Sequence, residues 1–402
     1  MIGLNQFISN KVTKRNSSMF YTDINCNKKE LKSKIEGKSI LVIGGAGSIG
    51  SSFIKAVLPF KPKSLVVVDI NENALAELTR DLRSTKGMFV PDNYVPYPMD
   101  FASPVFEKMF IKRDGFDIVA NFSAHKHVRS EKDIYSVEAL LRNNVLNAKI
   151  LLDLLELYPP EEYFCVSTDK AANPVNIMGA SKRIMEDLIF SYSDKFPVKT
   201  ARFANVAFSN GSLPAGFLAR IQKLQPLSAP TDTKRYFVSP EESGQICMLA
   251  CMLGKNREIF FPKLEEAQMM TFDAIATSLL HEYGYEVLEC ASDEEAIEKA
   301  EELKNGGKRY PVHYSASDTS GEKSFEEFYT DTESVDMDRL SALGVITDKQ
   351  IPSRDRVQDL YNKLTTVFEK ELTTKEEVVE IIKDYLPNFE HIEKGRSLDS
   401  KM

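Results

Sequence analysis

The sequence has no long apolar run, and this absence excludes an ordinary membrane-spanning helix. Its longest apolar stretches, SLVVV and ICMLACMLG, are far shorter than the roughly 20 residues that cross a bilayer. The N-terminal residues lack an apolar core followed by small cleavage-site residues. We therefore expect no signal peptide, no membrane segment and a cytoplasmic location.

Cysteine and histidine are scarce, with five of each, and neither forms a metal-binding pattern. The cysteine count is odd and there is no CxxC pair, while Cys247 and Cys251 are one helical turn apart in an apolar run that is typical of a core. No two histidines have HxxxH spacing. These patterns predict a reducing compartment and no metal site.

Positive charge is not concentrated anywhere. The net charge is −8 and no long basic block occurs, which disfavours non-specific binding to nucleic acid or to a membrane surface. A small anionic ligand needs only a few local cations and stays possible. The 402 residues, 43% hydrophobic and 27% charged, are those of a soluble globular protein with one large domain and a lobe, or with two to three ordinary domains.

Strand-like and helix-like segments alternate from Lys38 to about residue 210. Apolar runs such as SILVIGG, SLVVVDI, DIVANFSA and YFCVSTD are separated by helical stretches such as ENALAELTRDLRS and VEALLRNNVLNAKILLDLLELY. This alternation predicts an α/β fold with a doubly wound parallel sheet, whose continuous apolar strands are covered on both faces. After residue 210 the alternation breaks down, with strand-like REIFFPKL as an exception.

A glycine-rich turn, VIGGAGSIG, follows the first strand and opens a helix. Gly44, Gly47 and Gly50 let the backbone approach a pyrophosphate, whose charge the helix N-terminus stabilises. Asp69 follows Gly50 by nineteen residues at the end of the next strand, where it can bond both adenosine ribose hydroxyls and would repel a 2′-phosphate. The pattern predicts bound NAD rather than NADP, and the alternative is a glycine turn without a ligand.

Further cofactor contacts are expected along the same sheet edge. Asp100 follows the third strand and could bond the adenine amino group, although a simple turn aspartate is nearly as good an interpretation. Asn144 is either a cofactor-loop contact or a helix-packing amide. Apart from one lysine, the residues expected to bind the cofactor are Gly44, Gly47, Ser48, Ile49, Gly50, Asp69, Asp100, Ser123 and Asn144.

Four regions are predicted along the chain. Residues 1–37 form an arm with one short helix, residues 38–210 a Rossmann domain that carries the active site, residues 211–345 mainly a substrate-binding lobe, and residues 346–402 a helical tail. Some segments of the lobe are expected to return to the Rossmann body. The charged stretch 291–306 is expected to be a surface insertion, and Thr374 with Glu377 predicts a capping box for the last helix.

Several stretches together resemble one enzyme family. A glycine turn, a strand ending in Ser-Thr and a helix with lysine four residues after Met178 resemble the extended short-chain dehydrogenase/reductases. STDKAANPVNIMGASKR, SAHKHVRSE, RFANVAFSNGSLP, RYFVSPEE and SGEKSFEE resemble bacterial nucleotide-sugar 4,6-dehydratases, in particular the CapD-like branch that acts on UDP-N-acetylglucosamine. The resemblance runs from about Lys38 to about Leu343. The chain departs from the family at His125 and Ala204, in the 291–306 stretch, and in lacking membrane segments.

The resemblance implies roles for the segment VSTDKAANPVNIMGASK. Asp169 would be the acid at the carbon-6 hydroxyl, neutral Lys170 the base at carbon 5, and Thr168 the group that orients the carbon-4 hydroxyl or relays its proton. Lys182 would bond the nicotinamide ribose. Met178 would give shape only, since methionine is neither acid nor base. We expect an apolar cleft beside NAD⁺ to lower the pKa of Lys170, and the alternative for Asp169 and Lys170 is a solvated charged turn.

A nucleotide-sugar substrate also needs cations and polar partners. Arg235 is the first candidate for the diphosphate, Asn205 for a phosphate or the base, and Lys126 for the sugar or its carbonyl. Arg202 is equally well explained as a buried structural ion pair. The full expected set is Lys126, Asn205, Arg235, Arg202, Ser212 and Glu322; for Glu322, with its neighbour Lys323, solvated loop charges are an even alternative.

The leading hypothesis is NAD-dependent 4,6-dehydration of UDP-N-acetylglucosamine to UDP-2-acetamido-2,6-dideoxy-4-hexulose, with tightly bound NAD recycled in each turnover. A 4-epimerase or 4-keto reductase of the same fold is the first alternative, and a non-catalytic NAD-binding sensor or scaffold is the second. A homo-oligomer is expected from the fold. The nucleotide base and the stereochemistry at carbon 5 stay open, although the methionine-type site resembles that of retaining members.

Overall fold

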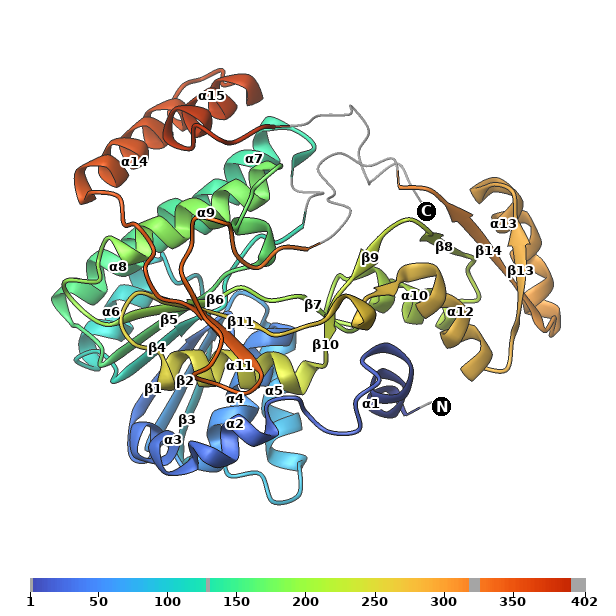
Figure 1. The fold of residues 1–402 in the computed structure, drawn as a ribbon, viewed down its shortest axis with the longest axis horizontal. Coiled ribbons are helices and arrows are strands. Elements are labelled where there is room, and N and C mark those ends of the chain that lie inside the picture. Colours follow the sequence, from blue (N-terminus) through green and yellow to red (C-terminus); the bar gives the residue numbers. More distant parts are fainter. Residues whose placement is uncertain (1–2, 128–130, 318–325, 392–402) are drawn as a thin grey trace.

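The computed structural model describes residues 3–127, 131–317 and 326–391, and its largest element is a nine-stranded sheet in the order β15-β16-β11-β6-β5-β4-β1-β2-β3 (Figure 1). Its strands are β1 (Ser39–Ile43), β2 (Ser64–Asp69), β3 (Asn93–Pro98), β4 (Ile118–Asn121), β5 (Glu162–Val166), β6 (Val198–Ala201), β11 (Glu258–Pro262), β15 (Val335–Asp336) and β16 (Leu343–Ile346). The strands from β3 to β11 pair in parallel, whereas β16 and β15 pair antiparallel at the edge. The predicted α/β fold with a doubly wound parallel sheet is confirmed.

The sheet is buried on both faces because its strands are continuous apolar runs. In β1, Leu41 and Ile43 point into the core on one face, and Ile40 and Val42 into the core on the other. The chain leaves β1 for β2 and β3 on one side and returns to β4 on the other side. In sheets of this kind ligands bind at the carboxyl ends of the strands where this reversal occurs, here between β1 and β4.

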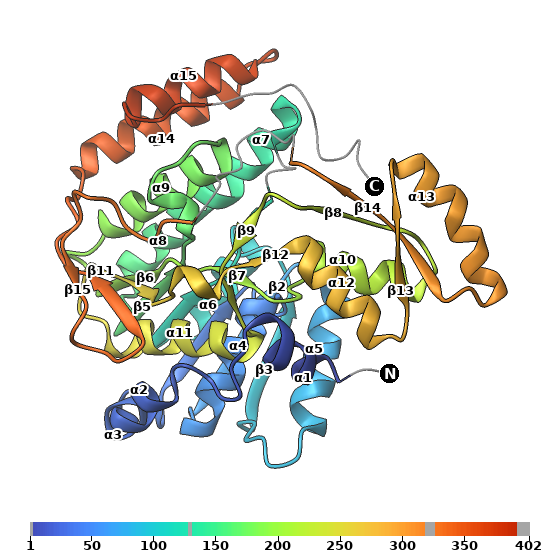
Figure 2. The same cartoon turned by 45° about the vertical axis from the view of Figure 1, so that its right-hand side comes forward.

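Helices cover the two faces as separate layers, as Figures 1 and 2 both show. The first layer is α6 (Pro104–Lys112), α7 (Ile134–Leu141), η4 (Arg142–Leu146), α8 (Asn147–Leu157) and α9 (Ile177–Phe190). The second layer is α3 (Lys28–Ile35), α4 (Ser48–Val57), η2 (Leu58–Phe60), α5 (Glu72–Ser84) and α11 (Pro240–Leu253).

A smaller lobe lies to one side of the sheet (Figure 2). It contains the three-stranded parallel sheet β13-β14-β8. Its elements are α10 (Leu213–Gln222), β8 (Leu227–Pro230), η6 (Glu266–Gln268), α12 (Phe272–Glu282), β13 (Glu286–Cys290), α13 (Asp293–Lys299), η7 (Ala300–Asn305) and β14 (Arg309–Ser315). Short strands β7 (Asn205–Val206) with β10 (Phe237–Val238), and β9 (Lys234–Arg235) with β12 (Met270–Thr271), join it to the body.

The charged stretch 291–306 is not an added surface insertion, contrary to the sequence prediction. It forms α13 and η7, which connect β13 to its parallel neighbour β14. A parallel pair needs such a crossover; Ala300 and Leu303 on the inner side of this one belong to the lobe's core, and Ala296 is buried. The high charge of the stretch reflects only its outer side.

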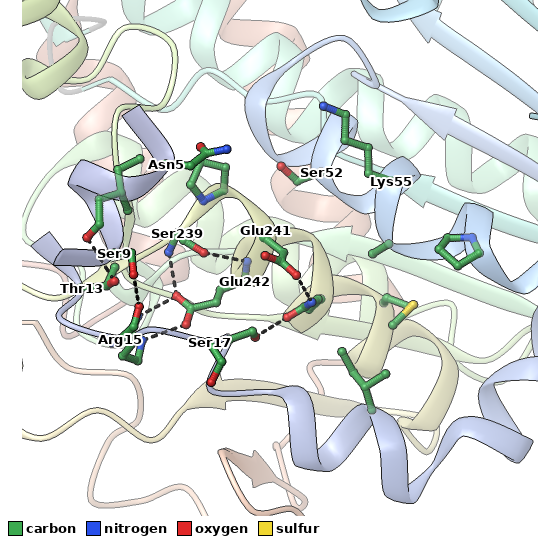
Figure 3. A pocket seen from close by; sticks show the side chains of 18 of the residues that line it. Asn5, Ser9, Thr13, Arg15, Ser17, Ser52, Lys55, Ser239, Glu241 and Glu242 are labelled. Atoms are coloured by element: carbon green, nitrogen blue, oxygen red, sulfur yellow. Dashed lines mark hydrogen bonds and ion pairs between the residues drawn. The ribbon is translucent and has the colours of Figure 1, made fainter. Parts of the chain in front are cut away.

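The N-terminal arm consists of α1 (Leu4–Phe7), the π-helical η1 (Ile8–Val12), α2 (Tyr21–Cys26) and α3, rather than the single helix expected. Phe7, Ile8 and Val12 are buried in the lobe's core, while α3 belongs to the body. Arg15, between the segments of the arm that pack on the lobe and on the body, forms an ion pair with Glu242 of α11 at 2.6 Å (Figure 3). A cavity of about 690 Å³ is lined by residues of the arm, of α4 and of the start of α11.

The tail forms α14 (Arg354–Phe368) and α15 (Lys375–Tyr385), which lie over the first helix layer (Figure 1). Thr374 and Glu377 exchange side-chain and backbone hydrogen bonds at the start of α15, so the predicted capping box is confirmed. None of the helices in the described part of the chain is both long and apolar enough to cross a membrane.

Candidate active site

The glycine turn between β1 and α4 has the shape that a pyrophosphate requires. Gly44 has φ of +70°, and a Cβ there would lie 2.6 Å from the backbone nitrogen of Ser123. A Cβ at Gly50 would lie 2.4 Å from the carbonyl oxygen of Gly44. At the helix N-cap, Gly47 supplies no side-chain hydrogen bond to the first turn of α4. The first turn of α4 thus lacks a side-chain cap, and a helix N-terminus of this kind can bind an anion such as a pyrophosphate.

Asp69 ends β2 beside this turn, as the sequence predicted. Its carboxylate accepts hydrogen bonds from the backbone nitrogens of Ala46 at 3.0 Å and Asn71 at 2.9 Å. Ser48 accepts a hydrogen bond from the backbone nitrogen of Asn210 at 2.8 Å, which ties the glycine turn to the loop that follows β7. Its neighbour Ile49 packs against the apolar core between the sheet and the second helix layer.

Asp100 and Asn144 both have local partners that account for their positions. Asp100 is exposed and accepts a hydrogen bond from the backbone nitrogen of Ala102, as a turn aspartate does. Asn144, in η4, bonds both backbone groups of His125 at 2.9 Å and the hydroxyl of Ser181 at 3.0 Å. Asn144 thus holds the loop after β4 against α9. In the same loop Ser123 hydrogen-bonds the side chain of Asn143, from η4, at 3.3 Å.

The proposed acid and base lie together where β5 ends. Asp169 and Lys170 open the short helix η5 (Asp169–Ala171), which Thr168 caps. The ammonium of Lys170 lies 3.1 Å from each carboxylate oxygen of Asp169, and the Thr168 hydroxyl lies 2.7 Å from one of them. Asp169 is 6% exposed and Lys170 29% exposed at the side chain, so this pair is not a solvated charged turn.

The pKa of Lys170 differs from the sequence expectation. Burial lowers it, but the negative charges of Asp169 and Glu326 raise it more, and the net pKa is raised above the usual value. Without a ligand the pKa is thus raised, and the lowering expected beside NAD⁺ stays a prediction. Glu326 lies far from Lys170 in the chain, and only the fold brings the two charges together.

The helix α9 presents its first turn to this pair. A Cβ at Gly179 would lie 2.7 Å from the carbonyl oxygen of Lys170, so the glycine permits the close approach. Glu131 accepts hydrogen bonds from the backbone nitrogens of Ile177 at 3.0 Å and Met178 at 2.8 Å and so satisfies the helix N-terminus.

Met178 and Lys182 are both buried in α9. Met178 is 2% exposed and packs in the apolar core between the sheet and the first helix layer, which agrees with a role in shaping the site. Lys182 donates a hydrogen bond to the carbonyl oxygen of Val166 at 3.0 Å, and burial lowers its pKa. Its ammonium therefore lies against the end of β5, directly before the acid and base.

A second group of polar side chains lies on β7 and β9. Glu326 accepts hydrogen bonds from the side-chain nitrogen of Asn205 at 2.7 Å and from the backbone nitrogen of Tyr236 at 2.8 Å. The Arg235 guanidinium lies 4.0 Å from the same carboxylate. Two predicted substrate residues, Asn205 and Arg235, are thus brought together by a carboxylate that the sequence analysis missed. The available signal was its position in SGEKSFEE, one of the stretches that carry the family resemblance.

Comparison with known proteins identifies the family. The model of a family described as polysaccharide biosynthesis protein matches residues 40–346, which is more than half of the chain. The chain belongs to this polysaccharide biosynthesis family. An uncharacterized membrane protein of Methanocaldococcus jannaschii is 30% identical over 357 residues, covering 86% of this chain and 96% of that protein.

Named relatives include enzymes of nucleotide-sugar chemistry. A UDP-N-acetylglucosamine 4,6-dehydratase (inverting) of Campylobacter jejuni is 25% identical, covering 74% of this chain and 84% of that enzyme. A UDP-glucose 4-epimerase of Rickettsia bellii is 27% identical over 60% of this chain and 70% of its own length. The probable polysaccharide biosynthesis protein EpsC of Bacillus subtilis is 30% identical over 64% of this chain, which spans only 42% of EpsC.

Solved structures share the fold of this family member. Pen from Bacillus thuringiensis aligns with a TM-score of 0.63 at 20% identity, covering 82% of this chain and 98% of Pen. DesIV, a dTDP-glucose 4,6-dehydratase of Streptomyces venezuelae solved with NAD, aligns with a TM-score of 0.53 at 16% identity, covering 87% and 97% of the two chains. At these identities the likeness supports the Rossmann architecture.

The structure corrects the assignment of Arg202 as a substrate residue. Its side chain is 0% exposed. All five of its N–H groups donate within the protein, to Glu186, Glu333 and the carbonyl oxygen of Phe328, at 2.7 to 3.0 Å. No donor is left for a ligand, so Arg202 in this family member is the buried structural ion pair that was the alternative interpretation.

The other predicted substrate residues have different surroundings. Ser212 caps α10 by accepting a hydrogen bond from the backbone nitrogen of Ala215 at 3.3 Å. Lys126 is exposed in the loop after β4. Glu322 and Lys323 lie outside the described residues.

Proposed function

We propose that this polysaccharide biosynthesis protein is an NAD-dependent nucleotide-sugar 4,6-dehydratase, with UDP-N-acetylglucosamine as its substrate. The observation that carries the proposal is the ion pair of Asp169 with Lys170 at the carboxyl end of β5, where Lys170 lies 3.1 Å from the carboxylate. The glycine turn at the end of β1 is only two strands away in the sheet, which is about 10 Å. An acid–base pair beside a dinucleotide turn is the minimum that this reaction needs.

The residues present fit NAD. A Cβ at Gly44 or Gly50 would collide with backbone atoms at 2.6 and 2.4 Å, and the first turn of α4 has no side-chain cap, so the cradle suits a pyrophosphate. Asp69 would hold the adenosine ribose and Lys182 the nicotinamide ribose. When bound, NAD would supply an acceptor for the hydride of carbon 4 and, once reduced, a donor of that hydride to carbon 6 after water has left.

The chain's own side chains supply the proton chemistry. The carbon-5 proton is not acidic until carbon 4 is a ketone; after that, Lys170 removes it and Asp169 protonates the carbon-6 hydroxyl as it leaves as water. Asp169 must therefore hold a proton at the moment of elimination, and Lys170 must be neutral. Thr168 orients the carbon-4 hydroxyl, and Met178 fills the place of a phenol without offering a proton.

The substrate's diphosphate is assigned to Arg235 and its uracil or phosphate to Asn205. Arg235 is 7% exposed at the side chain and has one carboxylate neighbour, at 4.0 Å. One of its N–H groups donates to the carbonyl oxygen of Lys234 at 2.8 Å, and within the described residues its other N–H groups make no hydrogen bond, in contrast to Arg202, all five of whose N–H groups donate. This contrast supports Arg235 as the guanidinium that meets the anionic substrate.

The test is to incubate the purified protein with UDP-N-acetylglucosamine and to follow the sugar by mass spectrometry and NMR. A product lighter by one water, with no net consumption of NAD, is the expected result. A product of unchanged mass with inverted carbon 4 would instead indicate an epimerase, which some relatives are named. Consumption of reduced cofactor on a 4-keto sugar would indicate a reductase.

A variant separates the enzyme from an NAD-binding scaffold. Lys170→Ala is expected to bind NAD as the wild type does and to lose dehydration by at least about 10²-fold, the smaller end of the effect of one positioned acid or base. Lys234→Ala is the matched control, because Lys234 is an exposed lysine on β9. Full activity in Lys170→Ala would refute the assignment of the base.

A further inference from the structure

Glu326 is a buried carboxylate that the dehydration chemistry outlined above does not use. Its side chain is 2% exposed. One oxygen accepts from the Asn205 amide at 2.7 Å and the other from the backbone nitrogen of Tyr236 at 2.8 Å. Because both oxygens accept hydrogen bonds, the carboxylate of Glu326 is held in one orientation. It lies among the residues that we assign to substrate binding and to acid–base chemistry.

Two carboxylates and two cations share this part of the site. Asp169 and Lys170 come from η5, Arg235 from β9, and Glu326 follows the lobe. Burial and the charge of Asp169 raise the pKa of Glu326 to about 7, although Lys170 and Arg235 act in the opposite direction. Conversely, Glu326 is one of the two charges that raise the pKa of Lys170. The proton of Lys170 therefore depends on a carboxyl group that itself gains or loses a proton near neutral pH.

We propose that Glu326 is a positioning residue of the dehydration site, which holds Asn205 toward the substrate and sets, by its own charge, how readily Lys170 gives up its proton. This inference rests on the proposed function, in which neutral Lys170 is the base. Glu326 contacts the substrate-binding amide directly and acts on the base only through its charge.

The sign of the effect follows from the charges. Ionised Glu326 favours the charged form of Lys170 and opposes loss of its proton. Protonated Glu326 leaves Lys170 with one carboxylate neighbour, Asp169, and loss of the proton becomes easier. Removing the charge permanently should therefore lower the pKa of Lys170.

Glu326→Gln is the variant that removes the charge and keeps the shape. The glutamine oxygen can accept from the Tyr236 nitrogen, and its amide can donate to the oxygen of a flipped Asn205. Glu327→Gln is the matched control, since Glu327 is the next residue and its carboxylate pairs with Asn173 at 3.1 Å. Glu326→Ala is a second charge-free variant, which keeps the test informative if the glutamine disturbs folding.

The primary measurement needs no substrate. Lys170 is 29% exposed, so its labelling by an amine-reactive reagent can be followed against pH by peptide mass spectrometry. The labelling midpoint is expected to fall to lower pH in Glu326→Gln and to stay at the wild-type value in Glu327→Gln. An unchanged midpoint in both charge-free variants would overturn the inference.

The second measurement is the pH profile of kcat/KM for UDP-N-acetylglucosamine. Its acidic limb, which reports the free enzyme's base, should move to lower pH in Glu326→Gln while KM rises through the loss of Asn205 orientation. If wild-type protein dehydrates no UDP-sugar but the Lys170 midpoint still shifts, the proposed function fails and the electrostatic link stands. If the wild type is active and the profile of Glu326→Gln is unmoved, the inference about Glu326 fails alone.

Discussion

Replacing Arg202 by methionine tests whether this arginine is structural. The substitution keeps the length and apolar stem of the side chain and removes a charge that is 0% exposed. Glu186, also 0% exposed at the side chain, would lose its 2.7 Å partner and Glu333 its 2.8 Å partner. Removing one partner of a buried ion pair costs about 3–5 kcal/mol, because the remaining charge stays buried without compensation.

Lys349 still compensates part of the negative charge of Glu186, so we expect the loss of unfolding free energy to lie near the lower end of that range. Its ammonium lies 2.8 Å from Glu186 and stays in place in the variant. Glu333 keeps Arg183, at 3.7 Å, and the backbone nitrogen of Thr330, which donates to it at 2.9 Å. We therefore expect Arg202→Met to lower the free energy of unfolding by about 3 kcal/mol.

Urea unfolding at pH 7, followed by circular dichroism, measures this loss. Arg235→Met is the matched control: Arg235 has one ion pair, at 4.0 Å, and a loss of about 1 kcal/mol is expected for it. UDP affinity, measured by calorimetry on the folded proteins, should weaken more in Arg235→Met. A stable Arg202→Met protein that has lost UDP affinity would refute the structural role and restore the substrate assignment.

Three further predictions follow from local features. Gly50→Ala places a Cβ 2.4 Å from a carbonyl oxygen of the glycine turn and should weaken NAD binding at least about tenfold, measured by calorimetry. Thr374→Ala removes the side-chain cap of α15 and should cost about 1 kcal/mol, visible as faster amide exchange in that helix. Burial raises the pKa of Glu186 but Arg202 and Lys349 lower it more, to well below its usual value. Its stabilising contribution is therefore present above the unfolded pKa of about 4.3 and is lost as pH falls from there through the lower folded pKa, so the stability difference between wild type and Arg202→Met should shrink as pH falls through this window.

The Rossmann body could be predicted because its signals are local. Apolar strands, the glycine turn and Asp69 occur in one stretch of chain, and hydrophobic periodicity alone indicates their arrangement. The parallel strands of the lobe could not be predicted in this way. The strand β13 has the sequence EVLEC with partly exposed positions, and it therefore contains no continuous apolar run. Its crossover helix α13 therefore looked like an insertion.

The residues of the candidate site also differ in whether the local sequence could predict them. Thr168, Asp169 and Lys170 are neighbours in sequence, and their position at a strand end follows from the apolar run before them. Glu326 and Arg202 depend on contacts across more than a hundred residues, which no local pattern contains. The charge of a buried residue cannot be judged without its partners, and for this reason both the pKa of Lys170 and the role of Arg202 were open until the fold was known.

The buried ion cluster and the acid–base pair are parts of one arrangement. Glu186, which Arg202 holds, accepts a hydrogen bond at 2.6 Å from the hydroxyl of Ser167, the residue just before Thr168. Arg202 also donates at 3.0 Å to the carbonyl oxygen of Phe328, two residues after Glu326. One guanidinium thus anchors both the segment that carries Asp169 and Lys170 and the segment that carries Glu326. Because a displacement of about 1 Å can cost about 10²-fold in rate, Arg202→Met should lose dehydration activity even where it remains folded, with NAD binding unchanged at the glycine turn, which lies outside the hydrogen bonds of Arg202.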